Sequence, residues 1–227
     1  GLSTVPAISD PVPVAGDFHQ RLPVTVKDHE GNSVTVTDTS RILALDINGT
    51  LSRTVIALGY GDKLVGRTVS STEKRLASLP VVTQSGPQLN AESIIALKPS
   101  VILADRSVGP PEAIDQLKAT GIPVVLVDSN RSVASAGTLI KTIAHALGAD
   151  DAGTALAKRT DGEIAAAKRQ IAQWAPKQKL DVAFLYVRGT AGIFFILGKD
   201  DGATELIEGV GANDVASARG LASTTPA

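Results

Sequence analysis

The sequence predicts an α/β fold with two lobes, the second incomplete within this chain. Three apolar runs each end in a carboxylate: residues 42–46, 101–105 and 124–128. Uninterrupted apolar runs of this length are typical of parallel strands that helices cover on both faces. Helix-forming stretches separate them, at residues 51–58, 91–97 and 111–120. We therefore predict an N-terminal α/β lobe over residues 41–131, whose ligands gather at the carboxyl ends of its strands.

Composition limits the possible partners. The chain has 227 residues, 43% of them hydrophobic, and a net charge of −1, so no basic excess favours a nucleic-acid partner. No apolar stretch approaches the roughly 20 residues of a membrane-spanning helix. Without cysteine, the chain can form neither disulfides nor thiolate metal sites. Methionine is also absent, even at position 1, which suggests that a signal peptide has been removed.

Residues 1–40 are expected to form a flexible leader and a β-hairpin. Residues 1–17 are rich in Pro, Ser and Gly, and they carry no strand or helix pattern. Residues 24–37 alternate apolar and polar on both sides of a turn at residues 30–32. His29 lies near this turn, where a solvated side chain is expected, and His19 has no assigned role.

Residues 132–176 are expected to be helical. They contain no proline before Pro176 and are dense in Ala, Leu, Lys and Ile. Gly148 should divide them into two helices, with Asp150 or Asp151 capping the second. Pro176 should end that helix at about Trp174.

The last segment, residues 177–227, is predicted to begin a C-terminal lobe. It contains a buried strand at 181–189, an apolar stretch at 193–197 and a helix at 203–208. About 50 residues follow Lys179, too few for a layer structure like that of the first lobe. We expect a truncated lobe, or a sheet that another chain completes.

One motif suggests an enzyme. Residues 42–51 resemble the first motif of haloacid-dehalogenase-like phosphatases, in which a strand delivers a nucleophilic aspartate, here Asp46. The second aspartate of that motif is replaced by Asn48, which cannot act as an acid or base. Downstream we find no acidic motif for Mg²⁺. The phosphatase therefore stays an alternative.

A longer resemblance covers nearly the whole chain. Four blocks resemble the substrate-binding proteins of metal-chelate ABC importers, which bind cobalamin, siderophores or haem: residues 41–45, 54–66, 89–104 and 121–128. That family has two Rossmann-like lobes joined by one long helix, which would end here near Trp174. Residues 186–198 most resemble its actinobacterial haem-binding lipoproteins. The resemblance implies a binding protein without catalysis, with ferric haem as cargo between the lobes.

Tyr186 and Arg188 are the residues implied to hold the iron. Side chains alternate along a strand, so the two point the same way. Fe³⁺ is a hard Lewis acid, and a cation beside a phenol favours the phenolate that such a metal prefers. Tyr186 is thus the expected metal ligand and Arg188 its hydrogen-bonding partner. A tyrosine packed at a cleft rim with a solvated arginine is the alternative.

The sequence departs from the haem-binding pattern at the opposite axial position. Relatives carry a histidine just ahead of the Leu89 block, where this chain has Pro87 and then Gln88. Five-coordinate iron held by Tyr186 alone, a weak or water ligand, and cobalamin or a ferric siderophore as cargo are the alternatives. His145 lies on a predicted amphipathic helix, where a surface or core role is expected.

Further contacts follow from the resemblance. Arg67 and Arg106 stand where a cleft would open and could pair with the haem propionates, although exposed loop arginines are equally ordinary. Phe194 and Phe195 could supply an apolar wall. Glu92 is the expected contact with the membrane permease, and its partner on the second lobe would fall beyond Ala227. Such proteins are extracytoplasmic and usually lipid-anchored through an N-terminal cysteine.

Overall fold

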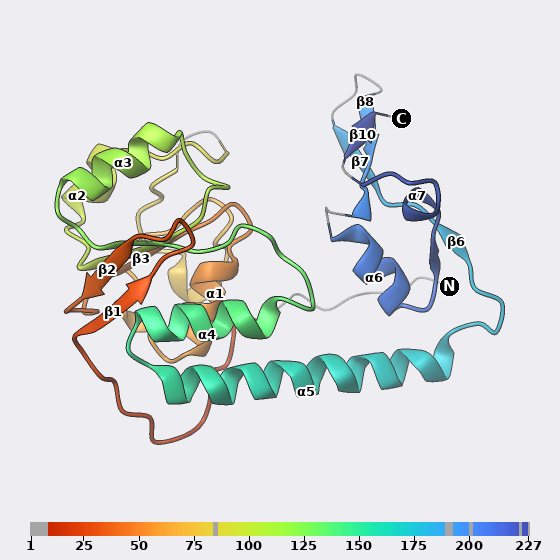
Figure 1. Ribbon diagram of the computed structural model, residues 1–227, viewed down its shortest axis with the longest axis horizontal. Coiled ribbons are helices and arrows are strands. Elements are labelled where there is room, and N and C mark those ends of the chain that lie inside the picture. The colour runs from red at the N-terminus through yellow and green to blue at the C-terminus, as the bar shows by residue number, and fades with distance from the viewer. Residues whose placement is uncertain (1–8, 84–85, 189–192, 200–201, 223, 227) are drawn as a thin grey trace. The chain divides into compact units, whose positions relative to one another are not determined.

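The computed structural model describes residues 9–83, 86–188, 193–199, 202–222 and 224–226, and the chain divides into two compact units. Unit 1 comprises Gly1–Ser129 and Thr138–Ala157, and unit 2 comprises Asn130–Gly137 and Lys158–Ala227. Figure 1 labels the elements of both. The predicted α/β fold class is confirmed.

A parallel three-stranded sheet lies at the centre of unit 1. Its order is β3 (Ile42–Leu45), β4 (Val101–Ala104), β5 (Val124–Leu126), and every residue of the three strands is buried. These are the three apolar runs that the sequence identifies. Because strands buried on both faces need no polar side chains, their continuous apolar pattern follows directly.

Helices cover both faces of this sheet, as Figure 1 shows. The flanking helices are α1 (Thr50–Ala57), α2 (Ala91–Ala96), α3 (Pro111–Ala119) and α4 (Ala136–Ala146). Side chains of alternate strand residues enter different clusters: Ile42 and Ala44 pack with α1 and α4, whereas Leu43 and Leu45 pack with α2 and α3. The period of two along each strand thus builds two apolar layers.

The predicted hairpin is confirmed as β1 (Val24–Lys27) and β2 (Ser33–Val36), which pair antiparallel. The Asp28 carboxylate holds the turn by accepting from the backbone N–H groups of Glu30 at 3.0 Å and Asn32 at 2.8 Å. Short polar side chains favour such turns because they replace backbone partners.

The described part of the leader has fixed partners, unlike the flexible segment expected for residues 1–17. The Asp10 carboxylate accepts from the backbone N–H of Lys74 at 2.8 Å, at the start of the 3₁₀ turn η2 (Lys74–Leu76). The Val14 N–H donates to the Ala57 carbonyl at 2.8 Å. These partners lie more than 40 residues away, so composition alone could not reveal them.

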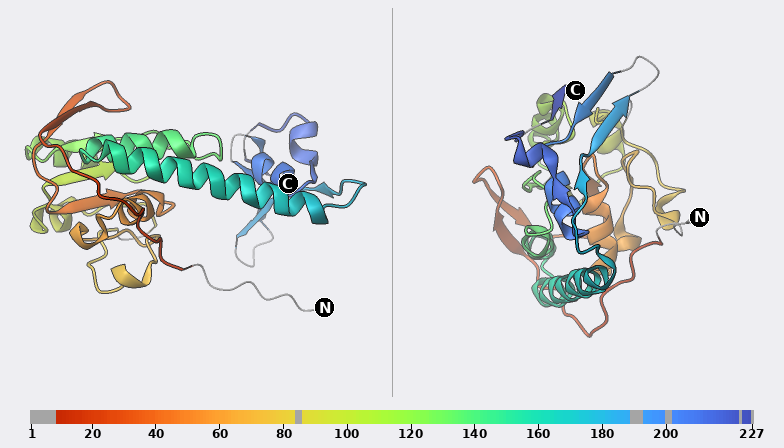
Figure 2. Two further views of the ribbon diagram at one scale, coloured as in Figure 1. Left: turned by 90° about the horizontal axis from the view of Figure 1, so that it is seen from below. Right: turned by 90° about the vertical axis from the view of Figure 1, so that its right-hand side faces the viewer.

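The two predicted helices are α4 and α5 (Asp150–Trp174), separated where expected. Figure 2 shows α5 as one unbroken helix. Gly148 adopts a left-handed φ of 66°, and a Cβ there would overlap the Arg21 carbonyl oxygen, which lies directly beside it. Glycine alone fits both requirements.

In the described part of unit 2, two small sheets and two short helices follow α5. The sheet β10–β8–β7 is antiparallel, formed by β7 (Leu185–Arg188), β8 (Ile193–Ile196) and β10 (Thr225–Pro226). A parallel pair joins β6 (Asp181–Val182) to β9 (Asn213–Asp214), with α6 (Ala203–Gly209) and α7 (Val215–Ala218) beside them. The helix predicted at 203–208 is confirmed.

The single buried strand predicted at 181–189 is wrong in two respects. It is split into β6 and β7, which belong to different sheets. The described side chains of β7 are also exposed, because β7 pairs only with β8 and no described element buries its faces. An apolar run predicts a strand, but not the layers that would cover it.

Candidate ligand-binding site

The β7–β8 hairpin positions Tyr186. This residue pairs in register with Phe195 across the antiparallel ladder, so the two side chains stand on one face of the sheet. Their ring centroids are 6.4 Å apart, with the ring planes tilted by 36°. Tyr186 is 51% exposed. Its phenol is therefore accessible to a ligand and has an aromatic neighbour on the same face.

The backbone also puts Arg188 on the face that carries Tyr186. Arg188 is the last residue of β7 and pairs with Ile193. Alternation along the strand aligns residues 186 and 188. The Arg188 side chain lies outside the described residues, so its hydrogen bond to the phenol stays a prediction.

The two phenylalanines of β8 face opposite ways. Phe195 is partly buried and shares the Tyr186 face, whereas Phe194 is exposed on the other. Of the two candidates for an apolar wall, Phe195 is the one that adjoins the phenol.

The Asp46 carboxylate binds backbone N–H groups at the start of α1. Asp46 is fully buried, and its carboxylate accepts from the backbone N–H groups of Thr50 at 2.8 Å and Leu51 at 3.4 Å, in the first turn of α1. A carboxylate here satisfies N–H groups that lack intrahelical partners and interacts favourably with the helix dipole. The geometry thus gives Asp46 a structural role, in place of the exposed position that a nucleophile needs.

Arg106 follows β4 as expected, but other carboxylates already engage it. Its Nε donates to Glu30 at 2.6 Å, and its Nη2 lies 4.0 Å from Asp115. The hydrogen bond to Glu30 raises the pKa of Arg106, and the same bond lowers the pKa of Glu30. Arg106 would have to release Glu30 to bind a ligand carboxylate.

Arg67 differs, since within the described part of the chain no carboxylate pairs with it. Its Nη1 makes one long bond, 3.4 Å, to the Ser71 carbonyl. Its Nε is buried and has no hydrogen-bond partner among the described residues. Because Nε is buried, a ligand could reach this guanidinium only through its Nη groups.

The remaining predicted residues lie at the surface of unit 1. Glu92 is exposed in the first turn of α2, which the Asn90 side chain caps. Pro87 and Gln88 are exposed in the preceding segment. His145 pairs with Asp150, Nδ1 to Oδ1 at 2.9 Å, where α4 meets α5.

Three exposed apolar residues of unit 1 escaped the sequence interpretation. Ile47 is 42% exposed, Val69 50% and Val81 44%. Isolated aliphatic residues in a sequence cannot be told from core residues, so only the burial pattern reveals them.

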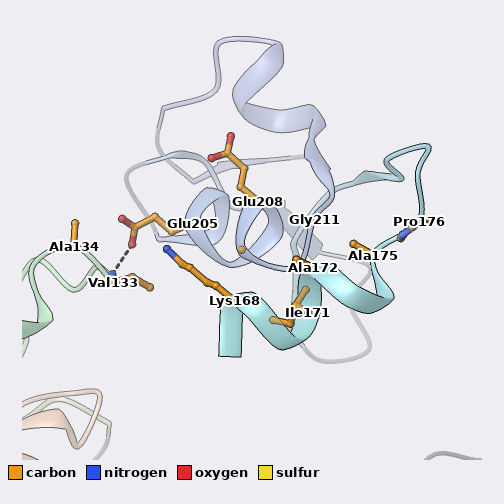
Figure 3. A pocket seen from close by; sticks show the side chains of 11 residues that line it. Val133, Ala134, Lys168, Ile171, Ala172, Ala175, Pro176, Glu205, Glu208 and Gly211 are labelled. Carbon is orange, nitrogen blue, oxygen red and sulfur yellow. Dashed lines mark hydrogen bonds between the residues drawn. The ribbon is translucent and has the colours of Figure 1, made fainter. Parts of the chain in front are cut away.

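Unit 2 contains a cavity of about 720 Å³ between α5 and α6 (Figure 3). Its lining includes Lys168, Ile171 and Ala172 of α5 and Glu205 and Glu208 of α6. The Glu205 carboxylate accepts from the Val133 N–H. None of the predicted ligand residues lines this cavity.

The described residues lack two features that would point to other functions. No group of three or more His, Cys, Asp or Glu side chains there could hold a metal ion. Nor does any described helix combine the length and hydropathy needed to cross a membrane.

Comparison with known proteins gives the following likenesses. A family model described as periplasmic binding protein matches residues 47–226. The ABC transporter substrate-binding lipoprotein YvrC of Bacillus subtilis (strain 168) is 29% identical over 199 residues, which are 86% of this chain and 62% of that protein. A vitamin B12-binding protein of Yersinia pestis (strain Pestoides F) is 42% identical over 72 residues, 32% of this chain and 26% of that protein. The chain thus spans less than two thirds of these relatives.

Among solved structures, the heme binding protein HmuT is 46% identical, with a TM-score of 0.92 over 100% of this chain and 74% of that chain. Three variants of HmuT, in which a histidine, an arginine or a tyrosine is replaced by alanine, match equally well, with TM-scores of 0.92.

Proposed function

This chain belongs to the periplasmic binding protein family, and from that premise we propose that it is the cargo-binding component of an ABC importer, with ferric haem as its cargo. The observation that carries this proposal is the half-exposed phenol of Tyr186 on β7, flanked by Phe195. A phenolate suits the hard Fe³⁺ ion, and an aromatic neighbour suits a flat macrocycle.

We assign iron ligation to Tyr186, a hydrogen bond to its oxygen to Arg188, and apolar contact to Phe195. The likeness to HmuT supports this assignment. In the HmuT variants the substituted arginine follows the substituted tyrosine by two positions, as Arg188 follows Tyr186. A guanidinium there would hold the phenolate form by charge and hydrogen bonding.

The opposite face of the iron would be coordinated differently here. In HmuT the substituted histidine precedes the tyrosine by the same number of positions as Pro87 precedes Tyr186. Proline has no side-chain ligand atom. We therefore propose five-coordinate iron, or a water as the sixth ligand, with Tyr186 as the one protein ligand.

The second candidate cargo is cobalamin or a ferric siderophore. Cobalamin is favoured by the vitamin B12-binding relatives, which share 42% identity over 72 residues. Pro87 favours both cobalamin and a siderophore, since neither cargo requires a histidine at this position.

Three further proposals concern the permease, the cellular location and the completion of unit 2. Glu92, exposed on α2, would contact the permease. The protein would act outside the cytoplasmic membrane, held by a lipid anchor as the name of YvrC indicates for that relative. Further polypeptide, from another chain or a further segment, would complete unit 2 and cover the exposed side chains of β7.

Titration of the protein with ferric haem, cyanocobalamin and a ferric hydroxamate siderophore separates these candidates. We expect haem to saturate one site and to give a Soret band with a charge-transfer band. No spectral change with haem would contradict the proposal, and saturable cyanocobalamin binding would support the second candidate. A phosphatase is tested by Mg²⁺-dependent phosphate release that Asp46→Asn abolishes; we expect none, because the buried Asp46 carboxylate is bonded to the first turn of α1.

A further inference from the structure

Two segments extend the parallel sheet of unit 1 beyond β3. Leu64 bridges Ile42 in parallel, and Arg67 bridges Val81 in parallel. The β3 strand and both segments therefore run in one direction. Their carboxyl ends meet at one edge, the edge at which α/β sheets usually bind ligands.

Hydrogen bonds show which residues reach that edge. Thr68 Oγ1 donates to the carbonyl of Asp46, directly after β3, at 3.2 Å. In the next segment, the Val69 N–H donates to Thr83 Oγ1 at 3.0 Å. Asp46 and Thr68, which this first bond joins, are neighbours on adjacent segments. Ile47 directly follows Asp46 and Val69 directly follows Thr68, so the two residues lie at the same edge of the sheet.

Apolar exposure is concentrated at this edge. Ile47 and Val69 at this edge are 42% and 50% exposed, and Val81, which lies level with Arg67 just before the edge, is 44% exposed. These three residues are here called the apolar edge. Among the described residues of unit 1, Val12 is the one other large apolar residue that is exposed. Exposed aliphatic residues that are scattered singly are ordinary. A group of them near the carboxyl ends of parallel strands, where such sheets bind ligands, indicates an interaction surface.

Arg67 adds a charge to the apolar edge. Because Arg67 and Val81 are partners in a parallel bridge, their side chains leave the same face. Val82, on the other face, is buried. As described above, no carboxylate of the described residues pairs with the Arg67 guanidinium. A ligand that brings its own carboxylate would supply this missing partner.

We propose that the apolar edge and Arg67 together form the surface through which unit 1 binds its cargo, and that this surface selects a flat apolar body bearing a carboxylate. The inference rests on the proposed function, under which the body is the porphyrin and the carboxylate a propionate. It assigns this contact to Arg67 in preference to Arg106, which Glu30 occupies.

Haem and its dimethyl ester test the carboxylate contact, because the ester keeps the macrocycle and the iron but lacks both charges. We expect Arg67→Gln to weaken the binding of ferric haem about tenfold, the loss of one charge-assisted contact, and to leave the binding of the ester unchanged. Arg67→Lys, which restores the charge, should recover part of the affinity. Arg75→Gln serves as the control, since Arg75 is exposed and pairs with Asp62.

The double variant Val69→Thr, Val81→Thr tests the apolar contact at nearly constant volume. We expect both ligands to bind about three- to tenfold more weakly, because a hydroxyl replaces a methyl group at each position. Val12→Thr is the control. Thermal unfolding of each variant shows whether the fold is retained.

The outcomes separate the two proposals. If the unaltered protein shows no haem spectrum, the proposed function fails, and this inference with it. If haem binds through Tyr186, two results of Arg67→Gln would refute the carboxylate contact. Either the affinities for haem and for the ester fall by the same factor, or neither affinity changes. If the double valine variant matches the Val12→Thr control, the apolar contact is refuted.

Discussion

The two tyrosines of this chain show how environment divides one residue type into two roles. Tyr60 packs against the core of unit 1, and burial raises the pKa of its phenol. Tyr186 lies half exposed on a hairpin beside Phe195. A partly buried phenol that resists ionisation is a poor metal ligand, so Tyr60 is the natural control for any substitution of Tyr186.

Arg188→Gln tests whether a cation maintains the phenolate. Without the positive charge, protons compete better for the Tyr186 oxygen. We expect the charge-transfer band of the haem complex to disappear at a higher pH on acidification than it does in the unaltered protein. Absorbance titrations from pH 8 to pH 4 measure both midpoints. An unchanged midpoint would show that Arg188 does not act on the phenol.

At the residue scale, the sequence predicts on which face of a strand a side chain lies better than it predicts which distant residue that side chain contacts. Strand alternation predicts that Tyr186 and Arg188 share a face, and this stays a prediction because the Arg188 side chain lies outside the described residues. It could not predict that Arg106 binds Glu30, because the two residues lie 76 positions apart and meet only when the hairpin turn packs beside β5, where the His29 N–H donates to the Leu126 carbonyl. The same limit hid the apolar edge, whose residues come from three separate segments.

Among the elements, the junction of α4 and α5 depends most on one residue. Gly148→Ala should destabilise the protein by about 3 kcal/mol, because a left-handed alanine costs about 1–2 kcal/mol and its Cβ would also overlap the Arg21 carbonyl. Urea unfolding measures the change.

Gly121→Ala isolates the conformational part of that cost. Gly121 has a φ of 81° and nothing within 4 Å of its added Cβ, so about 1–2 kcal/mol is expected. Equal destabilisation by the two substitutions would show that the Arg21 overlap is relieved by small movements.

The β1–β2 hairpin is tied to the rest of unit 1 by a pH-sensitive pair. The Arg106 hydrogen bond lowers the pKa of Glu30 below its ordinary 4.5. A depressed carboxyl pKa adds stability above pH 4.5, and this stability is lost as the pH falls through the folded-state value. Melting temperatures should therefore be lower for Glu30→Gln at pH 7, and the difference should shrink towards pH 3. The exposed Glu112→Gln is the control; a gap independent of pH would contradict the assignment.

Elements with strong periodicity are the ones that the sequence predicts. The parallel strands of unit 1, the helices α1, α2 and α3 and the long α5 fall within one or two residues of their expected bounds, whereas α4 begins at Ala136, four residues after the expected start. The strands β9 and β10 escaped, because strands of two residues carry no usable period and exist only through partners about 30 residues away.

At the scale of the whole molecule, the two units differ in how completely their apolar surfaces are covered. Unit 1 has apolar layers on both faces of its sheet, whereas the described residues of β7 remain exposed. The chain covers 74% of HmuT, so the complete ligand environment is a proposal that rests on this likeness.

Resonance Raman spectroscopy of the ferric haem complex tests the central claim most directly, because excitation in the charge-transfer band enhances vibrations of the iron–phenolate bond. We predict phenolate modes in the unaltered protein and in Tyr60→Phe, and their loss in Tyr186→Phe. Phenolate modes that persist in Tyr186→Phe, or a haem complex of the unaltered protein that lacks them, would contradict ligation by Tyr186.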